Sequence, residues 1–575
     1  MKRQGQLLSL ISKAGGPGVK VRSKVIGRPL FGPRCVVDTS TQLIFPRRLS
    51  MATPGLVGED RVVHSHHPPL NLPKEAFGHT MIEALTRGGN SQAIYEVDTG
   101  RQYTNSDLKD AMVMVASGLI KLGYKKGDVI SICALNSAEY VILCLGVIAI
   151  GGTVSFINPL CSVDDLRDHL VDCKARAIAT FPQFTPIVQN VRQALPNLKD
   201  VIVFGEAEGC CPFSSLLSDD GSAFPDRVDI DPTSDIVLLP YSSGTTGMPK
   251  GVMITHSTIS ANIKQFIGAF PSVPEDRMLC YLPLFHIFGL MTSLSALVAG
   301  VTLVVTPRFD QNMLSVLEEQ RISILNLVPP VCMFLSKHPL AQQTDLSSVR
   351  VAVSGAAALS ADLLEQFQSA TGIQNTIQGY GMTECPIAIL DCKPALSGSV
   401  GRLLPNTRAK IVDVSDGRVL GAGEKGEICL QGPQVMAGYY GNPQATNDSL
   451  SQGWLRTGDI GYYNSDGYFF IHDRLKELIK YKAFQVAPAQ LEAILQTHPG
   501  VRDAAVIGVP DEEAGEVPRA FVVTVTGVSP TEEDITNFVK ERVSAYKQLR
   551  GGVRFIHEIP KSASGKILRR VLRES

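Results

Sequence analysis

The sequence predicts a mixed α/β protein with a large N-terminal domain of helix-covered, mostly parallel sheets, a β-rich subdomain, and a small α+β domain at its C-terminus. Short apolar strands alternate with helical segments from about Pro73 to Asp473, which is the pattern of parallel sheets covered by helices. Between about Gly398 and Gly441 the pattern changes to short strands and glycine-rich turns, which indicates the β-rich part. The residues after Arg474 have an α+β pattern of their own. The predicted divisions are an N-terminal extension (1–72), a large domain (73–475) and a small domain (476–575).

The individual elements follow from hydrophobic periodicity. Ser106–Leu122 has the spacing of an amphipathic helix that Gly123 ends, and Val129–Cys133 has that of a buried strand that leads to a helix from about Ala138. In the small domain, Thr531 followed by three acidic residues marks the start of a helix. Further strands are predicted at 177–179, 201–204, 324–328 and 349–353 in the large domain and at 504–509 and 520–525 in the small one.

Two segments, Tyr140–Ile157 and Gly289–Thr306, contain no charged residue and have the length of a membrane span. Gly151 and Gly152 interrupt the first segment, and Gly300 interrupts the second. After each interruption the residues become β-branched. We therefore predict a buried helix followed by a buried strand in both places, in preference to a transmembrane segment.

Composition and charge bound the class of protein. The 575 residues are 44% hydrophobic, which is enough for large buried cores, and the net charge of −1 gives no general attraction to nucleic acid or to an anionic membrane. None of the 12 cysteines forms a C-x-x-C pair, so we expect reduced thiols in an intracellular protein. His64, His66 and His67 lie close together in a proline-rich stretch, where we favour a solvated tail over a metal site.

The N-terminal residues are basic. Eight lysines and arginines precede the first acidic residue, Asp38, and glycine, serine and proline interrupt the apolar residues. This composition resembles an organellar transit peptide and predicts a mitochondrial location, with a disordered basic tail on a cytoplasmic protein as the alternative. Met51 offers a second start that omits this segment, and the C-terminal residues do not form the Ser-Lys-Leu peroxisomal signal.

One loop, Tyr241–Gly251, combines hydroxyls, glycines and a lysine between two apolar strands. Glycines allow several backbone N–H groups to point at one anion, while the hydroxyls and Lys250 add donors and positive charge, so the loop suits a triphosphate. It is not a Walker A motif, because Gly251 and not serine or threonine follows Lys250. The alternative is a flexible linker that binds nothing, but a linker has no need of a hydrophobic strand on each side.

Five separated motifs together resemble the acyl-adenylate-forming superfamily, in the branch of 4-coumarate–CoA ligases, medium-chain acyl-CoA synthetases and beetle luciferases. The resemblance covers roughly Pro73 to the C-terminus. Any one motif alone is weak, but five in the same order at matching separations are very specific. They are the loop at 241–251, Gln378–Glu384, Thr457–Asp459, the stretch from Asp473 to Pro488, and Pro560–Lys566.

The resemblance implies a first reaction step in which a carboxylate attacks the α-phosphorus of ATP and gives acyl-AMP and pyrophosphate. Two anions must approach each other, so cations and hydrogen-bond donors have to offset their repulsion. Lys566 is the implied adenylation lysine, which bridges the carboxylate and the α-phosphate. The other implied contacts are Ser242, Ser243, Gly244, Thr245, Thr246, Gly247 and Lys250 with the β- and γ-phosphates, Thr383 with the α-phosphate, Glu384 and Thr245 with Mg²⁺, Asp459 and Arg474 with the ribose, and Gln378, Gly379 and Tyr380 with the adenine or the acyl group; the implied catalytic residues are Lys566, Glu384, Thr246 and His286.

His286 and Phe288 bear on the acyl group. A histidine among apolar residues usually belongs to the core, but the resemblance implies that His286 borders the acyl and carboxylate pocket. Phe288 stands where the hydroxycinnamate ligases of the family often have tyrosine. The missing phenol favours an apolar fatty or aryl acid over a hydroxycinnamate.

In the implied second step, the thiol of coenzyme A displaces AMP and gives a thioester. The family rotates a mobile C-terminal domain between the two steps, which by motif position makes Lys476 the hinge. Lys480, Lys482 and Arg308 then face the nucleotide and coenzyme A. Ala483 departs from the family, since most members have glycine there beside the pantetheine path. Alanine is the smallest possible change, so we expect thioester formation to survive.

Three functions therefore compete. An ATP-dependent carboxylate–CoA ligase, with a small-molecule acid, ATP and coenzyme A as its partners, is favoured. The second is an adenylating enzyme that passes acyl-AMP to oxygen, as a luciferase does, or to a carrier protein. The third is a catalytically silent binding protein, against which the intact Lys250, Glu384, Asp459, Arg474 and Lys566 argue.

Overall fold

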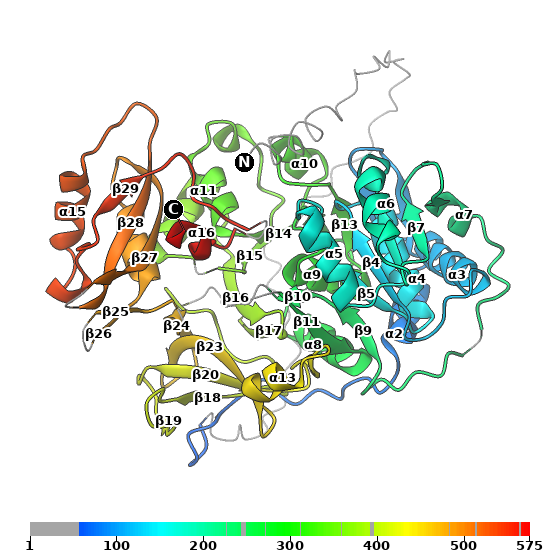
Figure 1. The fold of residues 1–575 in the computed structure, drawn as a ribbon, viewed down its shortest axis with the longest axis horizontal. Helices are drawn as coiled ribbons and strands as arrows, with labels where there is room; N and C mark the ends of the chain where they lie inside the picture. Colours follow the sequence, from blue (N-terminus) through cyan, green and yellow to red (C-terminus); the bar gives the residue numbers. More distant parts are fainter. Residues whose placement is uncertain are drawn as a thin grey trace, which may run out of the picture. The chain divides into compact units, whose positions relative to one another are not determined.

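The computed structural model describes residues 57–225, 227–242, 249–270, 272–310, 312–357, 359–391, 396–475, 477–481, 484–511, 514–562 and 565–574. The N-terminal segment with the predicted organellar signal lies outside these residues, so the mitochondrial location of the protein remains a prediction. The predicted fold class is confirmed: helix-covered, largely parallel sheets precede an antiparallel sheet and a small α+β domain (Figure 1).

The first large sheet has the strand order β10-β11-β9-β5-β4-β6-β7-β8. Its strands from β9 to β8 in this order pair in parallel, while β10 and β11 add antiparallel pairs at one edge. The predicted strand Val129–Cys133 is β4, with the predicted bounds. The other strands are β5 (Thr153–Phe156), β6 (Ala177–Thr180), β7 (Asp200–Val203), β8 (Cys211–Pro212), β9 (Ile236–Leu239), β10 (Tyr241–Ser242) and β11 (Lys250–Thr255), with β21 (Gly438–Tyr439) paired to β11.

The second large sheet has the order β17-β16-β15-β14-β12-β13-β2-β3 and is parallel from β16 to β2. Antiparallel strands close both of its ends. Its strands are β2 (Gln92–Glu96), β3 (Gln102–Thr104), β12 (Arg277–Cys280), β13 (Thr302–Val305), β14 (Ile324–Leu327), β15 (Val351–Ser354), β16 (Thr376–Met382) and β17 (Cys385–Leu390).

Alternate residues of these strands enter different cores. On β4, Ile130 and Ile132 pack into the main core, whereas Val129 and Cys133 face the opposite side of the sheet. The main core holds one layer of helices between the two sheets, and further helices cover the outer faces. The inner helices are α2 (Phe77–Gly88), α3 (Asn105–Lys121), α4 (Ala138–Ala149), α8 (His256–Ala269) and α9 (Ile287–Ala299); α5 (Val163–Asp172) and α6 (Thr185–Gln193) cover the first sheet, and α10 (Met313–Glu319), α11 (Pro329–Lys337) and α12 (Ala361–Thr371) cover the second.

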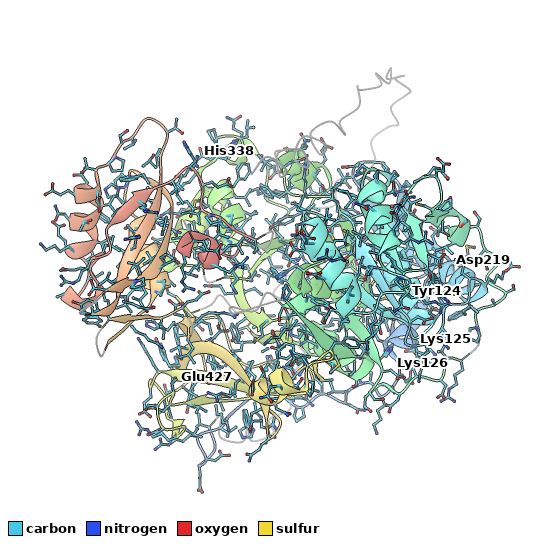
Figure 2. All side chains as sticks on the ribbon, viewed as in Figure 1. Tyr124, Lys125, Lys126, Asp219, His338 and Glu427 are labelled. Carbon is cyan, nitrogen blue, oxygen red and sulfur yellow. The ribbon has the colours of Figure 1, made fainter. Side chains whose placement is uncertain are left out.

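The ends of the predicted helices are confirmed. Thr104 caps α3 with its side chain, and Gly123 at φ 83° follows the last turn, where a residue with a Cβ is strained. Tyr124, Lys125 and Lys126 continue from there toward β4 (Figure 2). The remaining short helices of the large domain are α7 (Phe213–Leu217), α13 (Pro443–Ser449), η1 (Pro182–Phe184) and η2 (Ala341–Gln343).

The two uncharged segments form α4 followed by β5 and α9 followed by β13, as predicted. Both helices are buried, which explains why they are apolar all round. In the part of the chain that the structure describes, no helix is both long and apolar enough to cross a membrane.

The β-rich subdomain is larger than predicted and ends at Arg474, because β23 and β24 belong to its antiparallel sheet. This sheet also takes in residues 63–64 as β1, which pairs with β18. The strands are β1 (Val63–His64), β18 (Arg408–Val412), β19 (Val419–Leu420), β20 (Gly426–Gln431), β22 (Leu450–Ser451), β23 (Trp454–Tyr463) and β24 (Phe469–Arg474).

Residues 57–72 are therefore part of the fold and not of an extension, so the predicted boundary at 73 is too late. Val63 is buried, Ser65 Oγ donates to Leu403 O at 2.9 Å, and the Leu70 N–H donates to Asn406 Oδ1 at 2.7 Å. The solvated tail predicted around the histidines is wrong for His67, whose ring is partly buried, and this burial lowers the pKa of the ring.

The small domain (orange to red in Figure 1) is built on the long hairpin of β27 and β28. Helices α14 and α15 pack on one face of its sheet, and α16 packs on the other. The predicted helix start is confirmed, since Thr531 and Asp534 form a capping box for α15. The elements are β25 (Ile479–Tyr481), β26 (Phe484–Val486), α14 (Pro488–Gln496), β27 (Val501–Asp511), β28 (Gly515–Thr524), α15 (Glu532–Lys540), η3 (Ala545–Lys547), β29 (Val553–Phe555) and α16 (Arg569–Arg573).

Candidate active site

A cavity of about 810 Å³ lies beyond the carboxyl ends of strands from both large sheets. Asn158 follows β5 and Gly355 follows β15, and the turn between β16 and β17 forms another wall. In open α/β sheets this edge is the usual place for a ligand. The small domain contributes Ser562 and Lys566 to the same cavity. Of the residues predicted from the sequence, Ser242, His286, Gly379, Tyr380, Thr383, Glu384, Arg474 and Lys566 line it.

The predicted phosphate loop is described only at its two ends. Ser242 on β10 pairs with Lys250 on β11, so one short antiparallel hairpin holds both ends of the loop. The predictions for Ser243, Gly244, Thr245, Thr246 and Gly247, and those for Lys476, Lys482 and Ala483, concern positions outside the described residues.

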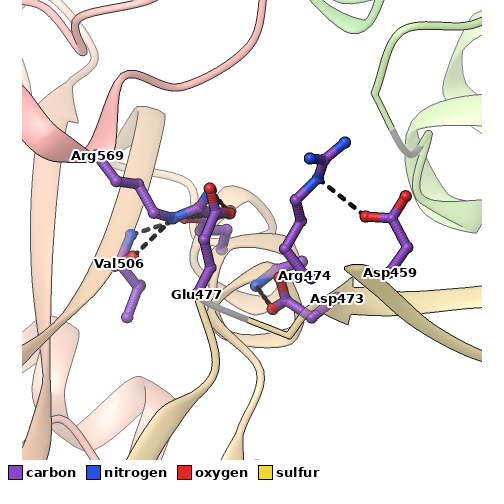
Figure 3. A network of polar contacts seen from close by, with 8 residues as sticks. Asp459, Asp473, Arg474, Glu477, Val506 and Arg569 are labelled. Atoms are coloured by element: carbon purple, nitrogen blue, oxygen red, sulfur yellow. Dashed lines mark hydrogen bonds and ion pairs between the residues drawn. The ribbon is translucent and has the colours of Figure 1, made fainter. Parts of the chain in front are cut away.

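Asp459, Arg474 and Tyr380 form a buried polar cluster beside the cavity. The antiparallel register of β23 and β24 places Asp459 opposite Arg474, whose Nε lies 2.9 Å from Asp459 Oδ1 (Figure 3). The Tyr380 hydroxyl donates to Asp459 Oδ2 at 2.6 Å. Burial raises the pKa of Asp459, and Arg474 opposes that rise. The carboxylate is thus held in place by a cation and a donor.

Glu384, which lines the cavity, belongs to a second polar cluster. The Tyr439 hydroxyl donates to Glu384 Oε1 at 2.8 Å, and Lys250 Nζ lies 4.9 Å from the centroid of the Tyr439 ring. Tyr439 thereby connects the lysine of the phosphate loop to the buried carboxylate. Sequence reasoning missed Tyr439, because it reaches the site through the pairing of β21 with β11, which no local pattern indicates.

Lys566 reaches the cavity from the small domain. The sequence predicted an exposed loop at Pro560–Lys566, but Lys566 is partly buried against the large domain. Burial, followed by the nearby Arg474 guanidinium, lowers the pKa of the Lys566 ammonium. The polar composition of the loop predicted exposure, but Lys566 is covered where the loop meets the cavity.

His286 caps helix α9 and also faces the cavity. Its Nδ1 accepts the Phe288 N–H at 3.4 Å, which leaves Nε2 to carry the proton of the neutral ring. Burial and the charge of Lys566 lower the pKa of His286 to about 4, so the ring is neutral at pH 7. The core and the pocket interpretations of His286 are therefore compatible.

Five predicted residues that the structure describes do not line the cavity: Lys250 and Asp459, which belong to the two clusters described above, and Gln378, Arg308 and Lys480. Gln378 is buried behind it, where its Oε1 accepts the Leu359 N–H at 3.4 Å. Arg308 is exposed beyond β13, near Asp98. Lys480 is exposed on β25, where its backbone N–H donates to Glu516 Oε2 at 2.8 Å.

Comparison with known proteins agrees with this geometry. The model of the AMP-binding enzyme family matches residues 83–440, and that of the AMP-binding enzyme C-terminal domain matches residues 490–566. The chain belongs to the AMP-binding enzyme family. The match to the second model shows that the small domain is the C-terminal domain of this family.

Relatives and solved structures of the family span nearly the whole chain. 4-Coumarate–CoA ligase 2 of Petroselinum crispum is 40% identical over 530 residues, which are 90% of this chain and 97% of that protein. The anthranilate CoA ligase AuaEII in complex with anthranoyl-AMP superposes with a TM-score of 0.80 at 28% identity, over 88% of this chain and 98% of that one. ATP-bound MatB from Rhodopseudomonas palustris gives a TM-score of 0.79 at 26% identity, over 87% and 99% of the two chains.

Proposed function

We propose that this AMP-binding enzyme is an ATP-dependent acid–thiol ligase, which activates a small carboxylic acid as acyl-AMP and transfers the acyl group to coenzyme A. The position of Lys566 carries the proposal: a lysine of the small domain enters a cavity of the large domain that also contains Thr383, Glu384 and Arg474. Similarity to 4-coumarate–CoA and anthranilate CoA ligases supports coenzyme A as the acceptor.

In the first step, the protein has to bring a carboxylate to the α-phosphorus of ATP. Lys566 supplies the positive charge between the two anions, and Thr383 supplies a hydroxyl donor at the same wall. Asp459 accepts hydrogen bonds from the ribose hydroxyls, and Arg474 holds Asp459 in position. His286, neutral at pH 7, borders the carboxylate and donates from Nε2 without adding charge.

Mg²⁺ is commonly bound through one or two carboxylates together with substrate phosphates. Glu384 offers one buried carboxylate at the cavity, and the described residues contain no group of three or more His, Cys, Asp or Glu that could hold a metal by themselves. This donor set fits an ion that arrives with ATP and takes its other ligands from the phosphates. When bound, Mg²⁺ would reduce the negative charge of the triphosphate; Thr245, the second predicted ligand, is outside the described residues.

The coenzyme A step rests on the family's domain rotation, with Lys476 as the proposed hinge. In the described arrangement Lys480 is exposed and away from the cavity, as a residue must be if it contacts the nucleotide only after rotation. Lys482, Ala483 and Arg308 remain proposed contacts of the same step.

The acyl part of the cavity favours an apolar acid. Phe288, Val353, Ala356, Ile387 and Leu390 contribute hydrocarbon to its walls. The Phe288 ring lies against Gly355 so closely that a Cβ at Gly355 would be 2.9 Å from its Cζ. A hydroxylated acid would bury a donor here without a partner, which costs roughly 1–3 kcal/mol. We propose a fatty acid or an aryl acid without polar ring substituents.

Phe288→Tyr is expected to shift this preference. The added phenol hydroxyl gives a polar ring substituent a hydrogen-bond partner, so the kcat/KM ratio of hydroxylated to unsubstituted aryl acids should rise about tenfold. Phe309→Tyr is the matched control, because Phe309 packs against Tyr281 and Phe334 outside the cavity. An unchanged ratio in Phe288→Tyr would place the acyl group elsewhere.

The lowered pKa of Lys566 predicts the alkaline limit of the first step. The protonated ammonium is the active form, so acyl-AMP formation is present below its pKa and is lost as pH rises through a value lower than the ordinary 10.5. Lys566→Arg keeps the charge at higher pH and should move the alkaline limb upward, at a reduced maximal rate. Pyrophosphate release measured across the pH range tests this prediction. If the alkaline decline falls at the same pH in the wild type and in Lys566→Arg, a group other than Lys566 causes it.

A screen of carboxylic acids tests the function as a whole. Pyrophosphate release is measured with fatty and aryl acids, with and without coenzyme A, on protein that begins at about Met51. Release together with a thioester supports the proposal. Release without any thioester favours transfer to another acceptor, and no turnover with any acid class favours a silent binding protein.

A further inference from the structure

The loop that carries Lys566 is closed on itself and anchored at both ends. Lys561 and Ile567 form a β-bridge, and the Ser562 N–H donates to Lys566 O at 2.8 Å. At the first end, Lys561 Nζ lies 2.6 Å from Asp503 Oδ2 on β27. At the second end is Arg569, three residues after Lys566. The direction in which Lys566 extends therefore depends on where these two ends are fixed.

Arg569 uses its donors on three different residues, Val506, Glu492 and Glu477 (Figure 3). Its Nε donates to Val506 O at 3.1 Å, and its Nη2 donates to the two oxygens of Glu492 at 2.7 and 2.8 Å. Its Nη1 lies 2.6 Å from Glu477 Oε2. Glu477 lies between β24 and β25, in the segment that joins the two domains (the joining segment), whereas Val506 on β27 and Glu492 on α14 belong to the body of the small domain.

The joining segment is itself attached to the large domain. Asp473, at the end of β24, accepts the backbone N–H of Ala489 on α14 at 3.2 Å and that of Arg474 at 2.6 Å. Arg474 in turn pairs with Asp459 at the cavity. The backbone N–H of Glu477 donates to Arg474 O at 3.0 Å, so a continuous series of polar contacts runs from the cavity through the joining segment to Arg569.

A buried ion cluster of this kind is weak evidence for stability, because removing charges from water costs about as much as their attraction returns. Fixed geometry is the better reason for it. The planar guanidinium has N–H groups in a rigid fork, and it can hold Glu477 and Glu492 at once in a way that a lysine cannot.

We propose that Arg569 is a positioning residue for the first reaction step, which directs Lys566 into the cavity by tying the base of its loop to Glu477 in the joining segment. The proposal rests on the proposed function for its kinetic consequence. A loop displaced by about 1 Å can cost on the order of 10²-fold in rate. The tie is not needed after domain rotation, when Lys566 has left the cavity.

The sharpest test is Glu477→Ala, because it removes only the side-chain contact of Arg569 with the joining segment and leaves Arg569 paired with Glu492. Acyl-AMP formation should fall roughly 10- to 100-fold through kcat, with little change in the KM for ATP. Thioester formation from supplied acyl-AMP should stay within about twofold of the wild type, since a positioning defect at Lys566 does not affect it. The assay is run well below the alkaline limb, because Glu477 also contributes to the pKa of Lys566.

Arg569→Lys is the second variant and should show the same split between the half-reactions. Arg570→Lys and Glu558→Ala are the matched controls, as both residues are exposed in the small domain. Equal loss of both half-reactions, or no loss of acyl-AMP formation, would overturn the proposal. Hydrogen exchange of residues 560–568 should rise in Glu477→Ala and Arg569→Lys but not in the controls. Unchanged exchange would also overturn the proposal. This readout needs no substrate, so it is independent of the proposed function.

Discussion

Lys566→Ala is expected to lower the rate of acyl-AMP formation by about 10²–10³, which corresponds to roughly 3–4 kcal/mol of lost transition-state stabilisation. Lys566 is the lysine that the small domain contributes to the lining of the cavity. The loop keeps its β-bridge and its two ion-paired ends without this side chain. The loss should therefore concern chemistry and not folding.

The two half-reactions separate this role from a general defect. Pyrophosphate release with a saturating acid measures the first step, and thioester formation from supplied acyl-AMP measures the second, which should remain near the wild-type rate. Lys540→Ala, an exposed lysine of the same domain, should match the wild type in both. Parallel loss of both half-reactions in Lys566→Ala would contradict the assignment.

Asp459→Ala is expected to combine the second large loss of activity with a loss of stability. Without the carboxylate, the Tyr380 hydroxyl and the Arg474 guanidinium lose their shared acceptor, which lies 96% buried between them. Breaking a buried pair by removing one partner costs about 3–5 kcal/mol, and the lower end applies here because Arg474 is partly exposed. The same change removes the proposed acceptor of the ribose hydroxyls.

The KM for ATP in Asp459→Ala should rise by at least about tenfold, equal to one charge-assisted hydrogen bond. Asp459→Asn retains the shape and one acceptor oxygen, so its unfolding midpoint should be nearer to that of the wild type while the KM for ATP stays raised. Asp466→Ala, an exposed carboxylate of the same sheet, is the control. A KM for ATP that does not change would remove Asp459 from the nucleotide site.

The local sequence pattern was sufficient to predict those helices and strands whose own residues determine which side is buried. Val129–Cys133 is a strand with the predicted bounds, and the helix that Gly123 ends lies within a residue of its predicted range. The capping residues Thr104 and Thr531 carry the same local information. For these elements the hydrophobic spacing and the terminal hydroxyl act within a few residues, so a single sequence contains what is needed.

Pairings between distant segments could not be predicted in the same way. Tyr439 reaches Glu384 because β21 joins β11, and Val63 is buried because β1 joins β18, more than 300 residues later. Polar composition also misplaced Lys566, since a loop that is exposed in its own domain can be covered by another. Of the candidate site, the sequence supplied the residue types through the motif resemblance, whereas their clustering came only from the tertiary fold.

The pairing of β1 with β18 has a practical consequence for anyone who shortens this protein. A protein that starts at Pro73 would lack β1. The backbone N–H and C=O groups of β18 that pair with β1 would then be exposed and could pair with strands of other molecules. Such a truncated protein is expected to aggregate during purification, although it keeps every residue that lines the cavity. Trimming should stop before Val57, and Met51 is a convenient place to begin.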